Sequence, residues 1–206
     1  AFLFETAALE WWLDGEIQQK DCSMKVLLTG SGGREYALLS LLAKSPDVTR
    51  LTCAPGNDAM GEVSLISNGA RVELLPISAG EGRAIADYAN NYHFDLVVPG
   101  PEISIEGGLG DCCRKYGIPF AGPCSRGGLL ETSKVYQYQF LEDSHIPRPD
   151  GRICVSVKSA LDAAIHFEGK VAVRADGLAA GKGVLLAKTM REAEDAINRI
   201  MVKREF

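Results

Sequence analysis

The chain has 206 residues, of which 46% are hydrophobic and 24% charged, a composition typical of a globular protein that buries its core as one large or two small domains. Its formal net charge of −5 argues against a general nucleic-acid binder, because that function needs clustered positive charge. Neither the 6 cysteines nor the 3 histidines have zinc-ligand spacing, and no apolar run is long enough to span a bilayer.

Residues 1–23 are acidic and lack the basic start of a signal peptide, so we expect a cytoplasmic protein. We interpret them as an N-terminal extension, because a pattern of alternating strands and helices begins only at Lys25. The extension either forms a short helix or is a segment unrelated to the domains that follow it. For its paired Trp11 and Trp12, packing onto the neighbouring domain is favoured over a separate interaction site.

Between Lys25 and residue 123, short apolar strands alternate with helix-length segments. Strands are predicted at 25–29, 50–54, 71–75, 95–100 and 118–122. Helices are predicted before Ser45-Pro46 with Leu38, Leu39 and Leu42 on one face, over 82–92, and near 105–116. Strands separated by helices pair in parallel, so we predict an α/β fold with a Rossmann-like, doubly wound sheet. Sites in such sheets lie at the carboxyl ends of the strands.

A different pattern follows residue 123. We predict a helix from about Gly128 to His145, which the following Ile-Pro-Arg-Pro ends. After it come a strand at 152–156, a helix at 158–167, two strands at 170–175 and 183–188, and a last helix at 190–203. A glycine-rich loop joins the last two strands.

The sequence GSGGREYA, residues 30–37, follows the first predicted strand and opens the first predicted helix. It fits the dinucleotide fingerprint poorly, because Glu35 stands where the third glycine belongs and the second strand ends without a ribose-binding acid. A glycine turn at a helix N-terminus still attracts an anion, and Arg34 adds a donor suited to phosphate. The alternative is a turn that serves only tight packing.

The sequence VRADGLAAGKGV, residues 173–184, is the loop between the last two strands. It is no Walker A motif, because only three residues separate Gly177 from Gly181-Lys182 and glycine follows in place of Ser or Thr. A glycine hairpin that carries Arg174 and Lys182 suits a lid over a triphosphate. An ordinary hairpin with two solvated charges is the alternative.

Six segments, in this order, resemble the N-terminal half of the phosphoribosylamine–glycine ligase family: GSGGREYA, APGN (54–57), VVPGPE (97–102), GIPFAGP (117–123), LETSKVYQYQFL (130–141) and VRADGLAAGKGV. The family is an ATP-grasp ligase of purine biosynthesis, which joins glycine to 5-phosphoribosylamine through a glycyl phosphate made from ATP with magnesium. The resemblance implies a substrate domain at 24–123 that precedes a linker helix and the first part of an ATP-grasp domain at 124–206.

The resemblance also implies site residues. Those expected to bind the phosphoribosyl substrate are Gly30, Gly32, Gly33, Arg34, Glu35, Asn57, Gly100, Pro101 and Glu102. Those expected to bind ATP are Lys134, Arg174, Asp176, Gly177, Leu178, Ala179, Ala180, Gly181, Lys182 and Gly183. The chain departs from the family at Tyr36, where histidine is usual, and at Arg174, where lysine is usual. The second change keeps the charge but replaces a compact ammonium with a planar fork.

The family's adenine pocket and acidic magnesium ligands have no counterpart before Phe206, so we expect the metal ligands outside this sequence. Without them in-line phosphoryl transfer loses its main stabilisation. We therefore expect this chain alone, as a fragment, a truncated product or part of a split enzyme, to be catalytically incompetent. Phosphate release from phosphoribosylamine, glycine and ATP by the purified chain would contradict this.

The expected partners are the small molecules 5-phosphoribosylamine, glycine and ATP. We expect the chain to bind neither nucleic acid nor membranes. Two alternatives stay open. One is another purine-pathway ATP-grasp ligase, which the pairing of GSGGRE with DGLAAGKG disfavours. The other is a catalytically inactive module that binds nucleotide or sugar phosphate.

Overall fold

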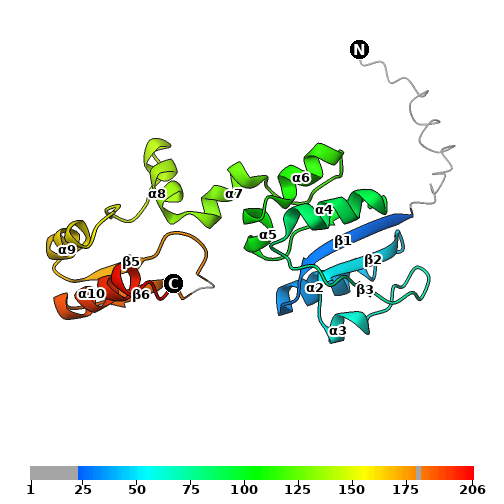
Figure 1. Ribbon diagram of the computed structural model, residues 1–206, viewed down its shortest axis with the longest axis horizontal. Coiled ribbons are helices and arrows are strands. Elements are labelled where there is room, and N and C mark those ends of the chain that lie inside the picture. Colours follow the sequence, from blue (N-terminus) through cyan, green and yellow to red (C-terminus); the bar gives the residue numbers. More distant parts are fainter. Residues whose placement is uncertain (1–22, 180–181) are drawn as a thin grey trace, which may run out of the picture.

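The computed structural model describes residues 23–179 and 182–206. The expectations for residues 1–22, Trp11 and Trp12 included, lie outside this part of the chain, as do those for Ala180 and Gly181. Figure 1 shows the described residues as two units joined by the helices α7 and α8. One unit contains the strands β1 to β4, and the other contains β5 and β6.

The first unit is built on a four-stranded parallel sheet in the order β3-β2-β1-β4. Its strands are β1 (Met24–Gly30), β2 (Val48–Pro55), β3 (Glu73–Leu74) and β4 (Leu96–Val98). Phe120 adds one parallel bridge to Val97, so the strand predicted at 118–122 is reduced to a single pairing. The predicted α/β class with a doubly wound parallel sheet is confirmed.

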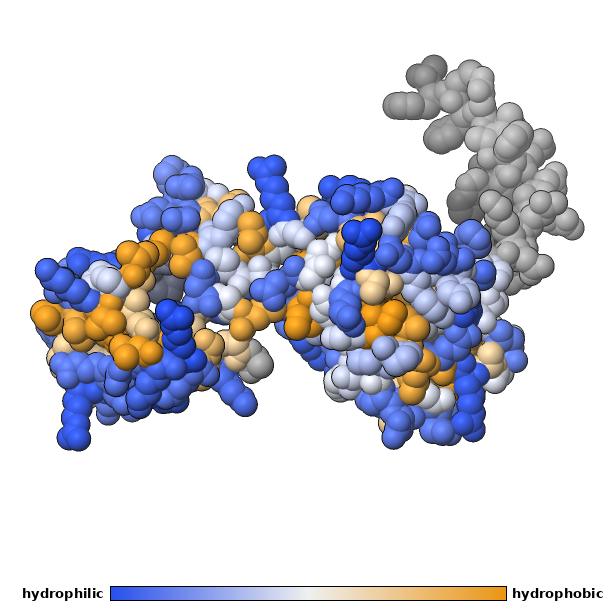
Figure 2. Space-filling view, viewed as in Figure 1, coloured by the Kyte–Doolittle hydropathy of each residue, from blue (hydrophilic) through white to orange (hydrophobic). Residues whose placement is uncertain are grey.

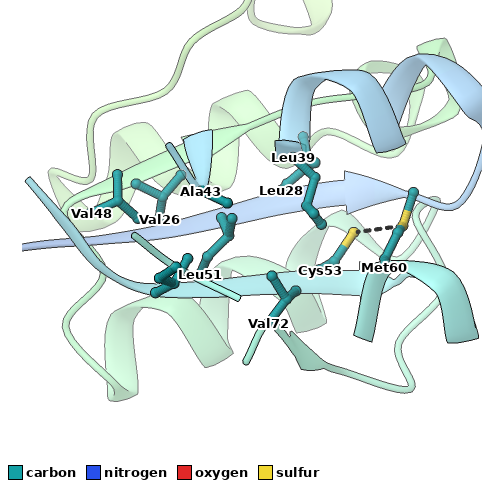
Figure 3. Close-up of a cluster of buried hydrophobic side chains, with 10 residues drawn as sticks. Val26, Leu28, Leu39, Ala43, Val48, Leu51, Cys53, Met60 and Val72 are labelled. Atoms are coloured by element: carbon teal, nitrogen blue, oxygen red, sulfur yellow. Dashed lines mark hydrogen bonds between the residues drawn. The ribbon is translucent and has the colours of Figure 1, made fainter. Parts of the chain in front are cut away.

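Helices cover both faces of this sheet because successive residues of a strand point to opposite sides. On one face Val26 and Leu28 of β1 pack with Leu39 of α2 (Gly33–Leu42) and Met60 of α3 (Asp58–Gly61). Figure 3 shows this cluster, in which the sulfur atoms of Cys53 and Met60 lie 3.7 Å apart.

On the other face Leu27 of β1 packs against α4 (Gly82–Asn91) and α6 (Leu109–Tyr116). The buried residues of these two helices are Ile85, Ala86, Ala89, Leu109 and Cys113. The two clusters fix β1 at the centre of the sheet, with its carboxyl end at the edge where sites are expected.

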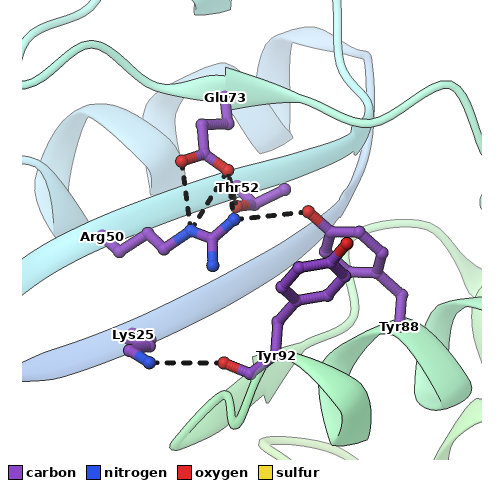
Figure 4. A network of polar contacts seen from close by, with 6 residues as sticks. All are labelled: Lys25, Arg50, Thr52, Glu73, Tyr88 and Tyr92. Atoms are coloured by element: carbon purple, nitrogen blue, oxygen red, sulfur yellow. Dashed lines mark hydrogen bonds and ion pairs between the residues drawn. The ribbon is translucent and has the colours of Figure 1, made fainter.

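A polar network ties the far end of the sheet together (Figure 4). The Arg50 guanidinium forms an ion pair with Glu73 at 2.7 Å and donates a hydrogen bond to the Tyr88 hydroxyl at 3.3 Å. Its carbon Cζ also lies 5.5 Å from the ring centre of Tyr92, within the range of a cation–π contact. These contacts join β2, β3 and α4. The charged side chains of Arg50 and Glu73 remain partly exposed to solvent.

Two helices predicted as continuous are each broken. The helix near 105–116 becomes α5 (Glu102–Glu106) and α6, separated by Gly107 and Gly108. A Cβ at Gly107 would lie 2.3 Å from the carbonyl oxygen of Gly80, and Gly108 has φ of 73°. Glycine is required at this break for a close backbone approach and a left-handed turn.

The helix predicted at 128–145 becomes α7 (Ser125–Thr132) and α8 (Lys134–Asp143). Ser133 separates them in an extended conformation, and its hydroxyl accepts a hydrogen bond from the Tyr136 N–H at 3.1 Å. This is the N-cap interaction that starts a new helix.

The second unit is a two-stranded antiparallel sheet of β5 (Val171–Arg174) and β6 (Val184–Ala187) with helices on one face. The helices are α9 (Val157–His166) and α10 (Met190–Ile197), which the π-helical turn η1 (Asn198–Val202) continues. Its small core consists of Ala160, Ala164, Ala187, Ala193 and Ile197.

The strand predicted at 152–156 is wrong, because this segment pairs with no strand among the described residues. The alternation of Ile153 and Val155 resembles a strand, but the Val155 side chain is 90% exposed. Figure 2 shows apolar residues exposed among hydrophilic ones on both units. None of the described helices has the length and hydrophobicity to cross a membrane.

Candidate functional site

The predicted substrate residues meet at the carboxyl edge of the four-stranded sheet. β1 leads into the bend Gly30–Gly33, β2 leads into Gly56 and Asn57, and β4 leads into the segment 99–102. The chain leaves β1 toward β2 and β3 and later returns to β4 on the other side of β1. The edge between β1 and β4 is therefore the switch point where doubly wound sheets bind ligands.

Glu35 is buried inside this bend and shapes it. Only 4% of Glu35 is exposed, and its Oε2 accepts a hydrogen bond from the Gly32 N–H at 2.8 Å, which caps α2. A Cβ at Gly100 would lie 2.3 Å from Glu35 Cγ, and one at Gly30 would lie 2.5 Å from the same atom. Glu35 stands where the dinucleotide fingerprint has its third glycine, and these two glycines make room for its side chain between the helix and the strands.

The packing interpretation of the glycine turn thus applies to Gly30 and Gly32, together with Gly100, because a Cβ at Gly32 would lie 2.6 Å from Glu35 Oε2. Gly33, in contrast, is exposed. No atom lies within 4 Å of a Cβ placed at Gly33, so the space beside the start of α2 is open. An exposed helix start with unshielded amides is suited to an anion.

Arg34 stands beside this open space. Its side chain is 69% exposed, and its Nη2 donates to Glu102 Oε1 at 3.2 Å, which holds the guanidinium next to the bend. The backbone N–H of Glu102, and after it Arg34, keep the pKa of the Glu102 carboxyl below its usual range. The Glu35 Oε1 lies 3.8 Å from Arg34 Nε and makes no hydrogen bond with any described residue.

Asn57 links the loop after β2 to the bend after β1. Its Nδ2 donates to the Ser31 carbonyl at 2.8 Å, and its Oδ1 accepts from the Met60 N–H at 3.0 Å, which caps α3. The Nδ2 therefore joins the two loops, and the Oδ1 fixes the start of α3. Pro101 is the N-cap residue of α5, which Glu102 begins.

Sequence reasoning missed a buried hydroxyl pair under this site. The hydroxyls of Thr29 and Ser104 lie 2.7 Å apart, and Thr29 Oγ1 also accepts the Gly100 N–H at 3.1 Å. These contacts hold α5 and the segment after β4 against the end of β1. The one sequence signal was Thr29, a polar residue at the end of an otherwise apolar strand.

The predicted nucleotide residues lie in the second unit and at the start of α8. Arg174 is exposed at the end of β5, opposite Val184, and Lys182 is exposed just before β6. Gly177 has φ of 88°, a left-handed conformation that favours glycine. A Cβ at Gly183 would lie 2.6 Å from the Ala179 Cβ. Leu178 and Ala179 are half-buried, and Ala180 and Gly181 lie outside the described residues.

Lys134, Asp176 and Gly177 are brought together. The Lys134 ammonium donates to the Gly177 carbonyl, and the Asp176 carboxylate accepts from the Ser133 hydroxyl at 3.1 Å and from the Val135 N–H at 3.3 Å. Partial burial opposes the charge of Asp176, but these donors prevail and hold the pKa of its carboxyl below the usual range. Ser133 was missed because the helix was taken as continuous, although a serine before a helical run is a start signal.

No three His, Cys, Asp or Glu side chains in residues 23–179 and 182–206 cluster in a way that could hold a metal ion. The site described so far therefore consists of main-chain amides, two arginines and two lysines around two bends. These groups all bind anions, phosphate above all.

Two family models match consecutive parts of the chain. The family model for phosphoribosylglycinamide synthetase, N domain, matches residues 24–131, and the model for phosphoribosylglycinamide synthetase, ATP-grasp (A) domain, matches residues 132–206. The phosphoribosylamine–glycine ligase of Phenylobacterium zucineum (strain HLK1) is 42% identical over 175 residues, which are 85% of this chain and 40% of that protein. The chain spans about 40% of the length of the curated relatives it matches.

Two solved structures are similar at low identity. The phosphoribosylamine–glycine ligase of Thermotoga maritima has a TM-score of 0.61 at 22% identity, over 86% of this chain and 40% of that one. The biotin carboxylase domain of the Hydrogenobacter thermophilus 2-oxoglutarate carboxylase, solved with MgADP, ADP and bicarbonate, has a TM-score of 0.66 at 17% identity, over 86% of this chain and 41% of that one. At such identities the likeness concerns the fold alone. Because the two family models together match residues 24–206, the chain belongs to the phosphoribosylglycinamide synthetase family.

Proposed function

We propose that this chain carries the sugar-phosphate and nucleotide-phosphate sites of a ligase that joins glycine to 5-phosphoribosylamine through a glycyl phosphate made from ATP. The match of both family domains supports the reaction. The observation that carries the assignment of the sites is the open start of α2 at the switch point, with Arg34 beside it. We further propose 24–123 as the substrate domain and 124–206 as a linker helix with part of an ATP-grasp domain.

In the substrate site, the phosphate of phosphoribosylamine binds the exposed start of α2. Gly33 and Arg34 begin α2, and the N–H groups of a first helical turn have no partner within the helix, where its dipole favours negative charge. The Arg34 side chain contributes a forked donor, and Glu102 positions it. Gly30, Gly32, Glu35, Asn57, Gly100 and Pro101 shape the bend that holds these groups.

In the nucleotide site, Lys134, Arg174 and Lys182 neutralise the phosphates of ATP, and the glycines around Gly177 and Gly183 let the backbone approach them. Two of these cations are exposed and the third is half-buried. Phosphoryl transfer depends on positioning and electrostatic stabilisation more than on covalent participation of the protein. Magnesium would supply further charge, but the described residues do not fit a magnesium site, and we assign no step to a metal here.

Replacing Arg174 with lysine is expected to raise the affinity for ATP by a few-fold. A compact ammonium approaches a phosphate oxygen more closely than a planar guanidinium in a narrow site, and the charge is unchanged. Isothermal titration calorimetry with ATP measures the effect. Arg191→Lys on α10 is the matched control and should leave the affinity unchanged. An equal or weaker affinity of the Arg174→Lys chain would contradict the role assigned to Arg174.

Titration of the 206-residue chain with ATP and with ribose 5-phosphate tests the proposed function as a whole. We expect both to bind, and each to bind in the presence of the other, because the groups assigned to them lie on different elements. Displacement of one ligand by the other, or failure of either to bind at millimolar concentration, would refute the assignment.

A further inference from the structure

The first turn of α8 is already occupied by an anion of the chain itself. A helix start leaves backbone N–H groups without partners inside the helix. Here the Tyr136 N–H donates to the Ser133 hydroxyl at 3.1 Å, and the Val135 N–H donates to the Asp176 carboxylate at 3.3 Å. The Ser133 hydroxyl in turn donates to Asp176 at 3.1 Å. A carboxylate that follows β5 thus caps α8, whose Val135 lies 41 residues earlier in the chain.

The next residue of the same segment engages the nearest cation. The Gly177 carbonyl accepts a hydrogen bond from the half-buried Lys134 ammonium. Asp176 and Gly177 with their partners Ser133, Lys134 and Val135 form one connected set of contacts, which we call the Asp176 latch. The pKa of Asp176 is lowered despite its partial burial, so the carboxylate is charged at neutral pH.

The latch occupies groups that the nucleotide phosphates need, if the proposed function holds. Lys134 is a phosphate ligand in that proposal, and the start of α8 is the helix end beside it. A phosphate that approaches Lys134 meets the negative charge of Asp176 within the same cluster. Two like charges a few ångströms apart repel each other even near a protein surface.

We propose that Asp176 is a built-in competitor of the nucleotide phosphates: its carboxylate occupies the start of α8, and the adjoining Gly177 carbonyl holds Lys134, until ATP displaces the latch. Part of the binding energy of ATP is then used to open the latch, so the free chain binds ATP more weakly than its phosphate-binding groups alone would allow. The inference concerns control of the nucleotide site and rests on the proposed function. It replaces the expectation from the family resemblance that Asp176 itself binds ATP.

Two substitutions separate the charge of Asp176 from its hydrogen bonds. Asp176→Asn removes the charge and keeps an acceptor, and Asp176→Ala removes both. We expect each to raise the affinity for ATP about five- to tenfold in calorimetry, as the loss of one nearby like charge implies. Inorganic triphosphate should show the same gain, and adenosine should show none because it carries no phosphate. Asp162→Asn, at an exposed position of α9, is the matched control and should change nothing.

Hydrogen exchange tests the latch without any nucleotide. The Val135 amide should exchange several-fold faster in the Asp176→Ala chain than in the parent, because it loses its acceptor. An unchanged Val135 exchange rate means that the latch does not form, and overturns the proposal. The proposal is also overturned if the parent chain binds ATP and both Asp176 variants bind it with equal or lower affinity. If the parent and all variants fail to bind ATP, the proposed function fails first and the competitor role falls with it.

Discussion

Replacement of Gly100 with alanine is expected to cost about 3 kcal/mol of folding free energy, or to prevent folding altogether. The new Cβ would lie 2.2 Å from the Thr29 carbonyl oxygen and 2.3 Å from Glu35 Cγ. The backbone cannot retreat without losing the hydrogen bond from the Gly100 N–H to the Thr29 hydroxyl. Urea unfolding followed by circular dichroism measures the loss.

Gly33→Ala is the control for this substitution. Gly33 lies on the other side of the same bend, where no atom would be within 4 Å of the new Cβ, and it begins α2. Alanine is the better helix former, so this variant should be unchanged or more stable by up to about 1 kcal/mol. If the two variants unfold at the same urea concentration, the bend is not packed around Glu35 as described.

Replacement of Leu39 with alanine is expected to cost about 2–5 kcal/mol, because it removes a fully buried side chain and leaves a cavity. Leu39 is 0% exposed in the cluster that joins α2 to β1 and β2, whereas its neighbour Leu38 is 40% exposed. Leu38→Ala should therefore cost less than about 1 kcal/mol. The same unfolding experiment compares the two.

This pair of leucines also tests the register of α2. The sequence placed Leu38 and Leu39 together on the buried face, and the structure buries only Leu39 and Glu35 on this helix. Equal losses for the two alanine variants, or a larger loss for Leu38→Ala, would show that α2 packs on the sheet in a different register.

The features that the sequence predicted well depend on local patterns. β1, β2 and β4 are apolar runs that end in glycine or proline, and such runs mark buried parallel strands. The two glycine bends follow strands in the sequence, so predicting the strands also predicted where the bends lie in the fold. The assignment of phosphate-binding residues came from several motifs that agree in order and spacing with one family, and it stays a prediction.

The features that the sequence did not predict depend on contacts between distant residues. Nothing near Glu35 indicates that a glycine at the end of β4 makes room for its side chain. Nothing near Ser133 shows that Asp176 will cap the helix that follows it. The false strand at 152–156 has the alternation of a strand but no partner strand among the described residues. In each case tertiary structure, which a local pattern does not contain, decided the outcome.

The central claim is that two separate bends of one chain bind the phosphates of two different ligands. Calorimetry of the Arg34→Ala and Lys134→Ala chains, each with ribose 5-phosphate and with ATP, tests it most directly. Loss of one charge-assisted contact should weaken binding about tenfold or more. We predict that Arg34→Ala weakens only ribose 5-phosphate and that Lys134→Ala weakens only ATP. Equal weakening of both ligands by either variant, or no weakening by both, would contradict the account.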